Sequence, residues 1–121
     1  MDSDMTVTAC FEHVGPTVPG VVSGYNAANI LMYQNTGTNA ISNAIGTPGV
    51  TKVIVGPGMY TESIYVYDDS ITIEASGVVC EAVIVGTWLI YGNDVIIDGF
   101  TFSGEVIEYG SNITIQNCSF W

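Results

Sequence analysis

The last third of the chain repeats itself without a gap, and this repeat limits the folds that the chain can adopt. Residues 89–102 align with residues 107–120 without insertion or deletion, and tyrosine, glycine, isoleucine and phenylalanine recur at matching positions. Within each copy, short runs of alternating apolar residues are separated by Gly, Asn, Asp or Ser. Such alternation is typical of β-strands, and the separators are turn residues. A strand repeat of this length indicates a solenoid, in which each turn buries its apolar side chains against the next.

Pairs of alternating apolar residues extend the repeat toward the N-terminus. The pairs are Val53/Val55, Ile71/Ile73, Val95/Ile97 and Ile113/Ile115. They predict one sheet of four stacked strands, in which the residue between the members of each pair points outward. Val53 precedes Ile71, and Val95 precedes Ile113, by the same number of residues that separates the two copies of the C-terminal repeat. The middle interval is longer, and its additional residues fit an enlarged turn around residues 76–81.

Residues 1–37 do not follow the repeat and form a predicted N-terminal arm, whereas residues 38–121 form the predicted solenoid. The alternating stretch 5–11 predicts a strand, and the prolines and glycine within residues 16–20 interrupt it. Residues 25–34 fit either one or two turns of helix or a strand.

A short helix is predicted where the arm meets the solenoid. Thr38 is a suitable N-cap, Ile41, Ala44 and Ile45 fall on one face, and Gly46 ends the helix before a proline. A helix this short is marginal alone, so it must pack against another element.

The residues that follow the helix carry a family resemblance. An apolar strand, the motif Gly-x-Tyr-x-Glu (Gly58, Tyr60, Glu62), a second strand and an Ile-Thr-Ile triplet come in that order. This order resembles the start of pectin-lyase-like proteins, a superfamily that includes pectinesterases. The resemblance covers roughly residues 38–121 and implies a right-handed parallel β-helix. It says nothing about activity, because enzymes and inert surface proteins share the fold.

The predicted fold class is therefore all-β: a short right-handed parallel β-helix with a short N-terminal helix and a non-repeat N-terminal arm. A left-handed β-helix, whose turn has the same length as this repeat, is the alternative. It is less favoured because its corners need small residues where this chain has Tyr, Ile and Phe. The phase of residues 64–67 stays open: the repeat aligns Tyr67 with Tyr91 and Tyr109, whereas the family pattern places Ile64 and Val66 inside.

Charge and hydropathy exclude several function classes. Lys52 is the single basic residue beside twelve carboxylates, which gives a net charge of −11. Nucleic acid is therefore excluded as a partner, because nothing neutralises its phosphates. The sequence has no apolar run long enough to predict a membrane span.

Enzymatic activity is not expected. The pectin lyases that the chain resembles use an arginine base with calcium, and the esterases use paired aspartates beside an arginine; this chain has no arginine. Paired carboxylates such as Asp68 and Asp69 suit glycoside hydrolysis, yet solvated pairs are the simpler interpretation. We predict no catalytic residue and no bound cofactor.

Glu74 and Asp98 are predicted to occupy equivalent positions in successive turns, about 4.8 Å apart. Two like charges so close would share a proton or recruit a cation, so a structural Ca²⁺ is one prediction for this pair. A solvated, splayed pair is the other.

Two glycosylation sequons and three cysteines bear on the compartment. Asn112 and Asn117 are the predicted glycosylation sites. Cys10, Cys80 and Cys118 match no zinc spacing; one disulfide with a free thiol and three inert buried thiols are both open. With the largely neutral polar composition, the sequons favour an extracellular or cell-surface glycoprotein.

Aromatic residues give one further candidate surface. The tyrosines and Trp88 would suit a sugar-binding face, which makes glycans a possible partner. On a small solenoid, packing is the more common role.

We expect a structural protein that assembles head to tail with copies of itself. A solenoid's last turn exposes apolar side chains and unpaired backbone, and no capping element is predicted there. Contact between two different ends does not close on itself and builds a filament. The arm would add as a strand to a neighbour. The predicted assembly residues are Val7, Phe11, Ile115, Phe120 and Trp121. The alternatives are an N-terminal fragment of a larger carbohydrate-active or carbohydrate-binding β-helix protein, and a viral fibre module.

Overall fold

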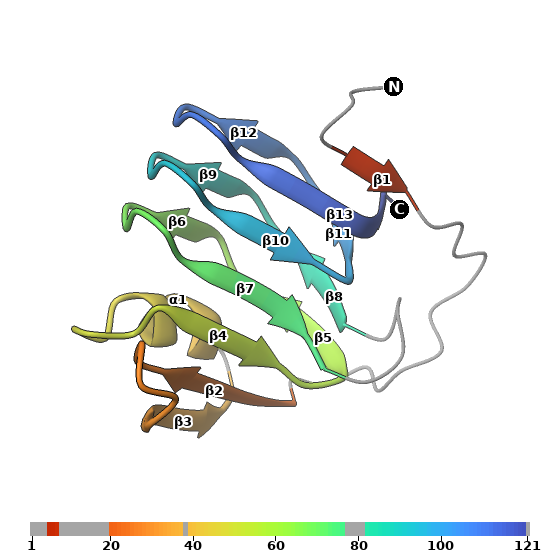
Figure 1. Ribbon diagram of the computed structural model, residues 1–121. Helices are drawn as coiled ribbons and strands as arrows, with labels where there is room; N and C mark the ends of the chain where they lie inside the picture. The colour runs from red at the N-terminus through yellow and green to blue at the C-terminus, as the bar shows by residue number, and fades with distance from the viewer. Residues whose placement is uncertain (1–4, 8–19, 38, 77–81, 121) are drawn as a thin grey trace.

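The chain coils into about three turns of parallel strands, as a computed structural model describes for residues 5–7, 20–37, 39–76 and 82–120. Each complete turn contributes one strand to each of three faces (Figure 1). The chain passes along the near face, turns behind it and returns at the back while rising, so the coil is right-handed. The predicted fold class is confirmed, including its single short helix among the described residues.

Strands on the same face pair in parallel throughout the coil. The first face holds β4 (Lys52–Val55), β7 (Thr72–Ala75), β10 (Ile96–Asp98) and β13 (Thr114–Phe120). The second holds β5 (Gly58–Thr61), β8 (Ala82–Val85), β11 (Phe100–Ser103) and the end of β13. The third holds β6 (Ile64–Val66), β9 (Trp88–Ile90) and β12 (Val106–Glu108).

The predicted inward positions of the first face are correct. All eight residues of the four apolar pairs are buried, whereas the residues between them are partly or largely exposed. The apolar side chains from successive turns meet along the coil axis, with aromatic residues such as Trp88 and Phe100 packed among them. The alternating pattern therefore encodes which side of each strand is buried.

The register of the first step differs from the prediction. Val53 pairs with Ile73, and not with Ile71 as the repeat predicted. The later steps agree with the prediction, since Ile73 pairs with Ile97 and Ile97 pairs with Ile115. The first corner, around Gly56 and Pro57, is longer by one pair of residues than the corner at Gly99. A shift of two residues along a strand returns every side chain to the same side of the sheet. The predicted buried side was therefore correct, although the predicted pairing was wrong.

The corner after the first face absorbs the variation in turn length. Glu74 pairs with Asp98 and Ala82 pairs with Phe100, so the corner between β7 and β8 is longer than the corner between β10 and β11. The predicted enlargement around residues 76–81 is confirmed, although residues 77–81 themselves lie outside the described ranges.

The turns that lead back to the first face explain other repeated residues. Ser70, Asp94 and Asn112 are equivalent, and their φ values of 57°, 58° and 57° lie in the left-handed region. Asn and Asp tolerate this conformation better than most residues. Gly92 and Gly110 stack so closely that a Cβ atom on Gly110 would meet the carbonyl oxygen of Gly92.

One end of the coil is covered by the helix α1 (Ala40–Ile45) and by a hairpin of β2 (Val21–Tyr25) and β3 (Leu31–Thr36). The hairpin settles the open alternative for residues 25–34 in favour of strand and turn, and β2 pairs antiparallel with β4. The helix buries four apolar residues on the core: Ala40, Ile41, Ala44 and Ile45.

The cap of α1 differs from the prediction. The N-cap is Asn39, with φ of 65° and no capping hydrogen bond from its side chain, and Thr38 lies outside the described residues. Gly46 does end the helix, through a hydrogen bond from its N–H to the Ser42 carbonyl oxygen.

The other end of the coil carries a strand from the arm. β1 (Met5–Val7) pairs in parallel with β13, with Met5 beside Ile115 and Val7 beside Cys118. The expectation of an uncapped last turn is therefore wrong for the first face. The predicted strand over residues 5–11 is described for residues 5–7 alone. None of the described helices is long and apolar enough to span a membrane.

Candidate functional site

The tyrosine of the Gly-x-Tyr-x-Glu motif fastens the start of the coil. Tyr60 is fully buried; its hydroxyl donates to the Gly56 carbonyl oxygen at 2.7 Å and accepts from the Gly20 N–H at 3.0 Å. Burial raises the pKa of the Tyr60 hydroxyl to about 12, and the neighbouring Glu62 carboxylate acts in the same direction. The Gly20 N–H, which favours the ionised form, offsets part of this rise. The side chain therefore joins three chain segments.

The glutamate of the motif serves as a remote cap for α1. Glu62 is buried, and its Oε1 accepts from the Ser42 backbone N–H at 3.0 Å and the Ser42 hydroxyl at 2.9 Å. It satisfies a donor in the first turn of α1, where the Asn39 side chain makes no capping bond. Glu62 Oε2 is buried and has no hydrogen-bond partner among the residues that the structure describes. The resemblance located both motif residues, but their partners follow from the structure.

Glu74 and Asp98 do lie side by side in register, as predicted, and each has other partners. Glu74 Oε1 lies 3.3 Å from Lys52 Nζ. The two oxygens of Asp98 accept from the side-chain amides of Gln116 and Asn117, each at 3.1 Å. No cluster of three or more His, Cys, Asp or Glu suited to a metal is present in the described part of the chain. The calcium site stays a prediction.

Both predicted glycosylation residues are exposed and have left-handed backbone; Asn112 precedes β13, and Asn117 lies within it. The φ values are 57° at Asn112 and 53° at Asn117. The Asn112 amide donates to Asp94 Oδ1 at 3.1 Å, and the Asn117 amide donates to Asp98. The side chains are accessible, and their modification is untested.

Cys118 is a free, fully buried thiol. Burial raises its pKa to about 11, against the opposing effect of the Phe100 and Gly99 N–H groups. The other disulfide candidates, Cys10 and Cys80, lie outside the described residues, so the pairing is untested.

The predicted assembly residues fall in different places. Ile115 is buried in the core of its own coil, in register with Ile97. Phe120 pairs with Phe102 on the second face, and Val7 lies in β1. Phe11 and Trp121 lie outside the described residues.

A row of stacked tyrosines runs along the outside of the coil. Tyr67, Tyr91 and Tyr109 follow one another in successive turns, with ring centroids 5.0 and 4.8 Å apart and planes within 8°. Tyr65 lies beside Tyr67, with 6.4 Å between centroids. Tyr91, which has a ring on both sides, is 42% exposed, against 67% for Tyr67 and 61% for Tyr109. Desolvation by its neighbours raises the pKa of Tyr91.

The question of which residues in 64–67 point inward is answered here, and the two predictions are compatible: Tyr67 aligns with Tyr91 and Tyr109, and Ile64 and Val66 lie inside. Ile64 and Val66 point into the core and are fully buried, and Tyr65 and Tyr67 point outward. Trp88, in contrast, is not part of an outer aromatic face. It is fully buried against Phe100 and Phe102, with centroids at 5.6 and 5.7 Å.

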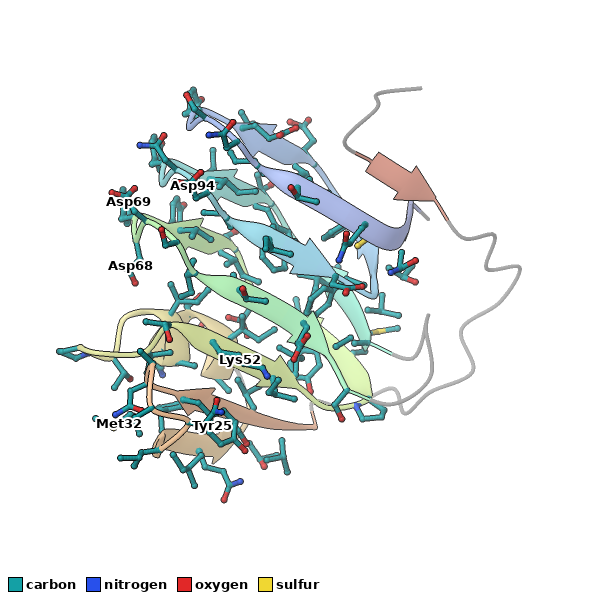
Figure 2. All side chains as sticks on the ribbon, viewed as in Figure 1. Tyr25, Met32, Lys52, Asp68, Asp69 and Asp94 are labelled. Carbon is teal, nitrogen blue, oxygen red and sulfur yellow. The ribbon has the colours of Figure 1, made fainter. Side chains whose placement is uncertain are left out.

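A polar row lies at the turns beside the tyrosines. Asp69 Oδ1 accepts from the Asn93 N–H, and Asn93 Oδ1 accepts from the Ser111 N–H, both at 2.8 Å. Figure 2 shows Asp68, Asp69 and Asp94 at these turns, along one side of the coil. These bonds tie successive turns together.

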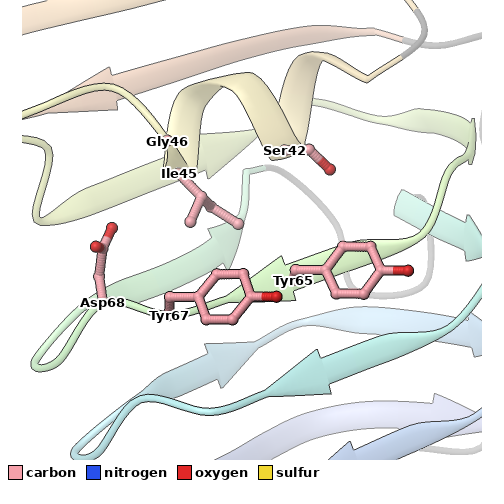
Figure 3. Close-up of a pocket in the computed structure, with 6 residues that line it drawn as sticks. All are labelled: Ser42, Ile45, Gly46, Tyr65, Tyr67 and Asp68. Atoms are coloured by element: carbon pink, nitrogen blue, oxygen red, sulfur yellow. The ribbon is translucent and has the colours of Figure 1, made fainter.

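The tyrosine row ends at a groove of about 260 Å³ under the helix. It is lined by Ser42, Ile45, Gly46, Tyr65, Tyr67 and Asp68 (Figure 3). A second hollow of about 440 Å³, formed by residues 45–51 with Asp68 and Asp69, shares part of the same wall. The sequence did not point to this groove, because helix and turn are brought together by folding.

The Asp68 carboxylate makes no hydrogen bond or ion pair with another described residue, whereas Asp69 is held by Asn93. In the close-up, Asp68 lies next to Tyr67, across from the end of α1 (Figure 3). The groove therefore combines an aromatic wall, an apolar wall from the helix and one carboxylate, without a basic side chain among its lining residues.

Comparison with protein-family models, with characterised proteins and with solved structures gave no match to this chain. The chain thus shows a short parallel β-solenoid, and the pectin-lyase-like resemblance is a proposal.

Proposed function

We propose that this chain is a structural subunit of an extracellular filament or surface fibre, and that copies join head to tail by exchanging β1. The observation that carries the proposal is the pairing of β1 with β13 at the far end of the sheet from β2. A strand that completes its own sheet can complete the same sheet of a neighbour with the same contacts, which makes such an exchange inexpensive in free energy.

The length of the connection permits this exchange. Five strand steps separate β2 from β1 on the first face, which is about 24 Å at the usual spacing. Residues 8–19 connect them, and a segment of this length can span about 40 Å when extended. The connection is therefore longer than pairing within one chain requires. The excess leaves room for β1 to reach an adjacent copy.

The roles of the polar residues support a structural assignment over an enzymatic one. Glu62 caps α1, Glu74 pairs with Lys52, and Asp98 accepts from two amides of the next turn. Each of these carboxylates stabilises the coil. The extracellular location is part of the proposal and is supported by the exposure of both sequon asparagines, Asn112 and Asn117.

A disulfide trap tests the exchange directly. Position 7 lies beside Cys118 in register, so a cysteine at position 7 reports where β1 is bound. We would replace Cys10 and Cys80 with serine and prepare a donor (Val7→Cys with Cys118→Ser) and an acceptor that retains Cys118. After mixing and mild oxidation, we expect a donor–acceptor dimer whose yield rises with protein concentration. Non-reducing electrophoresis and mass spectrometry would measure it.

A matched control places the cysteine at position 6 in place of Thr6, which is not in register with Cys118. Adjacent positions of a strand face opposite sides of the sheet, so we expect much less crosslinking from that donor. Negative-stain electron microscopy over the same concentrations should show fibres that disappear when residues 1–7 are deleted. No donor–acceptor dimer at any concentration, together with discrete small particles, would overturn the proposal.

A further inference from the structure

The groove under α1 does not contribute to the exchange of β1, which lies at the opposite end of the coil (Figure 1). Its aromatic wall consists of Tyr65 and Tyr67, whose planes lie within 8° of each other. Both rings are substantially exposed, at 47% and 67%. Neighbours in the next turn, Leu89 and Tyr91, lie on the side away from the helix. The groove thus lies where the tyrosine row ends against α1.

We infer that this groove binds an organic cation, namely an alkylammonium or guanidinium group. Aromatic rings attract such cations through the negative electrostatic potential of their faces. The Asp68 carboxylate adds an opposite charge at the same place, and Ile45 supplies apolar surface for the methylene groups that accompany an ammonium. The same chemistry is presented by a small-molecule amine and by a lysine or arginine side chain of another protein.

Charge complementarity selects this ligand over others. The chain has a net charge of −11, and its single basic residue, Lys52, is paired with Glu74. An acidic sugar or a phosphate would therefore meet repulsion without any local compensation, whereas a cation is attracted toward the whole surface. An inorganic divalent ion is a poorer match, because one carboxylate and two aromatic rings offer too few oxygen ligands.

Saturation-transfer NMR that observes the ligand tests the inference, and it works on single and assembled chains alike. The first probe is tetramethylammonium, with tert-butanol as a neutral probe of similar shape. We expect transfer to the tetramethylammonium methyl groups, binding that weakens with added salt, and little transfer to tert-butanol. Equal binding of both probes, or stronger binding of a neutral methyl glycoside, would overturn the inference.

Substitutions locate the binding. Asp68→Asn keeps the shape and removes the charge, and we expect the loss of this exposed opposite charge to weaken binding about fivefold. Tyr67→Leu should abolish measurable binding, while Tyr67→Phe, which keeps the ring, should retain most of it. The matched controls are Tyr109→Leu, at the other end of the tyrosine row, and Glu105→Gln; both should bind as the parent chain does. Binding that is unaffected by Asp68→Asn and Tyr67→Leu would overturn the site.

A second set of probes identifies the source of the cation. N-acetyl-lysine amide and N-acetyl-arginine amide carry the group alone, and a neutral hexapeptide with one central lysine carries it on a chain. Peptide binding at least tenfold tighter than that of the isolated amide supports a protein ligand. Equal binding supports a small-molecule amine. Failure of all the cationic probes would overturn the inference and leave the exchange of β1 unaffected.

Discussion

The two ends of the coil are closed in different ways. At the end that begins with β4, the helix α1 places four buried apolar residues on the core, and the β2–β3 hairpin covers the sheet edge. Buried side chains add specific bonds: Tyr60 joins Gly20 to Gly56, and Glu62 holds the first turn of α1. This closure depends on particular side chains with particular partners.

At the opposite end, the short strand β1 pairs with β13 and covers one of the three faces. No strand beyond β12 is present on the third face among the described residues. Val106 and Ile107 of β12 are half-buried, and Glu108 is exposed at the position where Val66 and Ile90 are fully buried. A polar residue thus replaces the core residue in the last turn.

The difference indicates which end can change partner. Backbone hydrogen bonds between strands are the same whichever chain supplies the strand, whereas buried side-chain bonds need one defined partner. A strand of three residues at the end of a sheet also opens more readily than a packed helix. We therefore expect the α1 end to be fixed and the β1 end to be exchangeable. Three predictions test this comparison.

The largest expected effect comes from a matched pair of glutamates, one at each end. Glu62→Ala leaves the Ser42 N–H without its buried acceptor and removes two hydrogen bonds to a charged group, so it should lower the free energy of unfolding by about 2–3 kcal/mol. Glu105→Ala, at an exposed position just before β12, should change it by no more than about 0.5 kcal/mol. Urea unfolding measures both. Similar losses for the two variants would contradict the proposed asymmetry.

Alkaline pH should weaken the α1 end through Tyr60. Its pKa is raised from 10.0 to about 12 in the folded chain, so the folded state holds the proton more tightly than the unfolded state does. The contribution is complete below pH 10 and is lost as pH rises toward 12, by up to about 2 kcal/mol. Comparing Tyr60→Phe with the parent chain between about pH 8 and 12 isolates this loss, since the other tyrosines remain. Parallel pH curves for the two proteins would contradict the prediction.

The last prediction concerns how fast the Cys118 thiol reacts, and it involves the smallest expected effect on stability. The thiol is fully buried, and its pKa of about 11 leaves little thiolate near neutral pH, so alkylation should be slow in the folded chain. In a background with Cys10 and Cys80 replaced by serine, deletion of residues 1–7 should speed alkylation at least tenfold, because the last turn loses its covering strand. Timed alkylation followed by mass spectrometry measures this. An unchanged rate would show that β1 does not protect this end.

Much of the coil could be predicted from the sequence, because its pattern is local. Alternation along residues 53–55 or 95–97 identifies the buried side of each strand, and the repeated Gly92 and Gly110 mark turns that stack closely. The one error of register arose at Gly56 and Pro57, where a longer corner shifts the pairing by one full strand period. The pattern of alternate residues cannot detect such a shift, because every side chain keeps its side of the sheet.

The candidate site was less accessible to prediction. The sequence aligned Tyr67 with Tyr91 and Tyr109, yet nothing in it placed Ser42 and Gly46 beside Asp68, because α1 and the turn after β6 meet only in the folded chain. Trp88 was wrongly considered for an outer face, since one aromatic residue in an alternating run fits either side of a strand until its neighbours are known.

The sequence by itself determined a coil of parallel strands with a short helix at its start, since the side-chain period and the turn residues act over a few positions. The right-handed sense of the coil was a prediction that came from the family resemblance. The tertiary structure alone decided that β1 joins β13, with Met5 beside Ile115 although they lie near opposite ends of the chain. Any open strand edge offers the same backbone donors and acceptors, so no local pattern specifies which strand will pair with it. That choice depends on where the edges lie after the coil has formed.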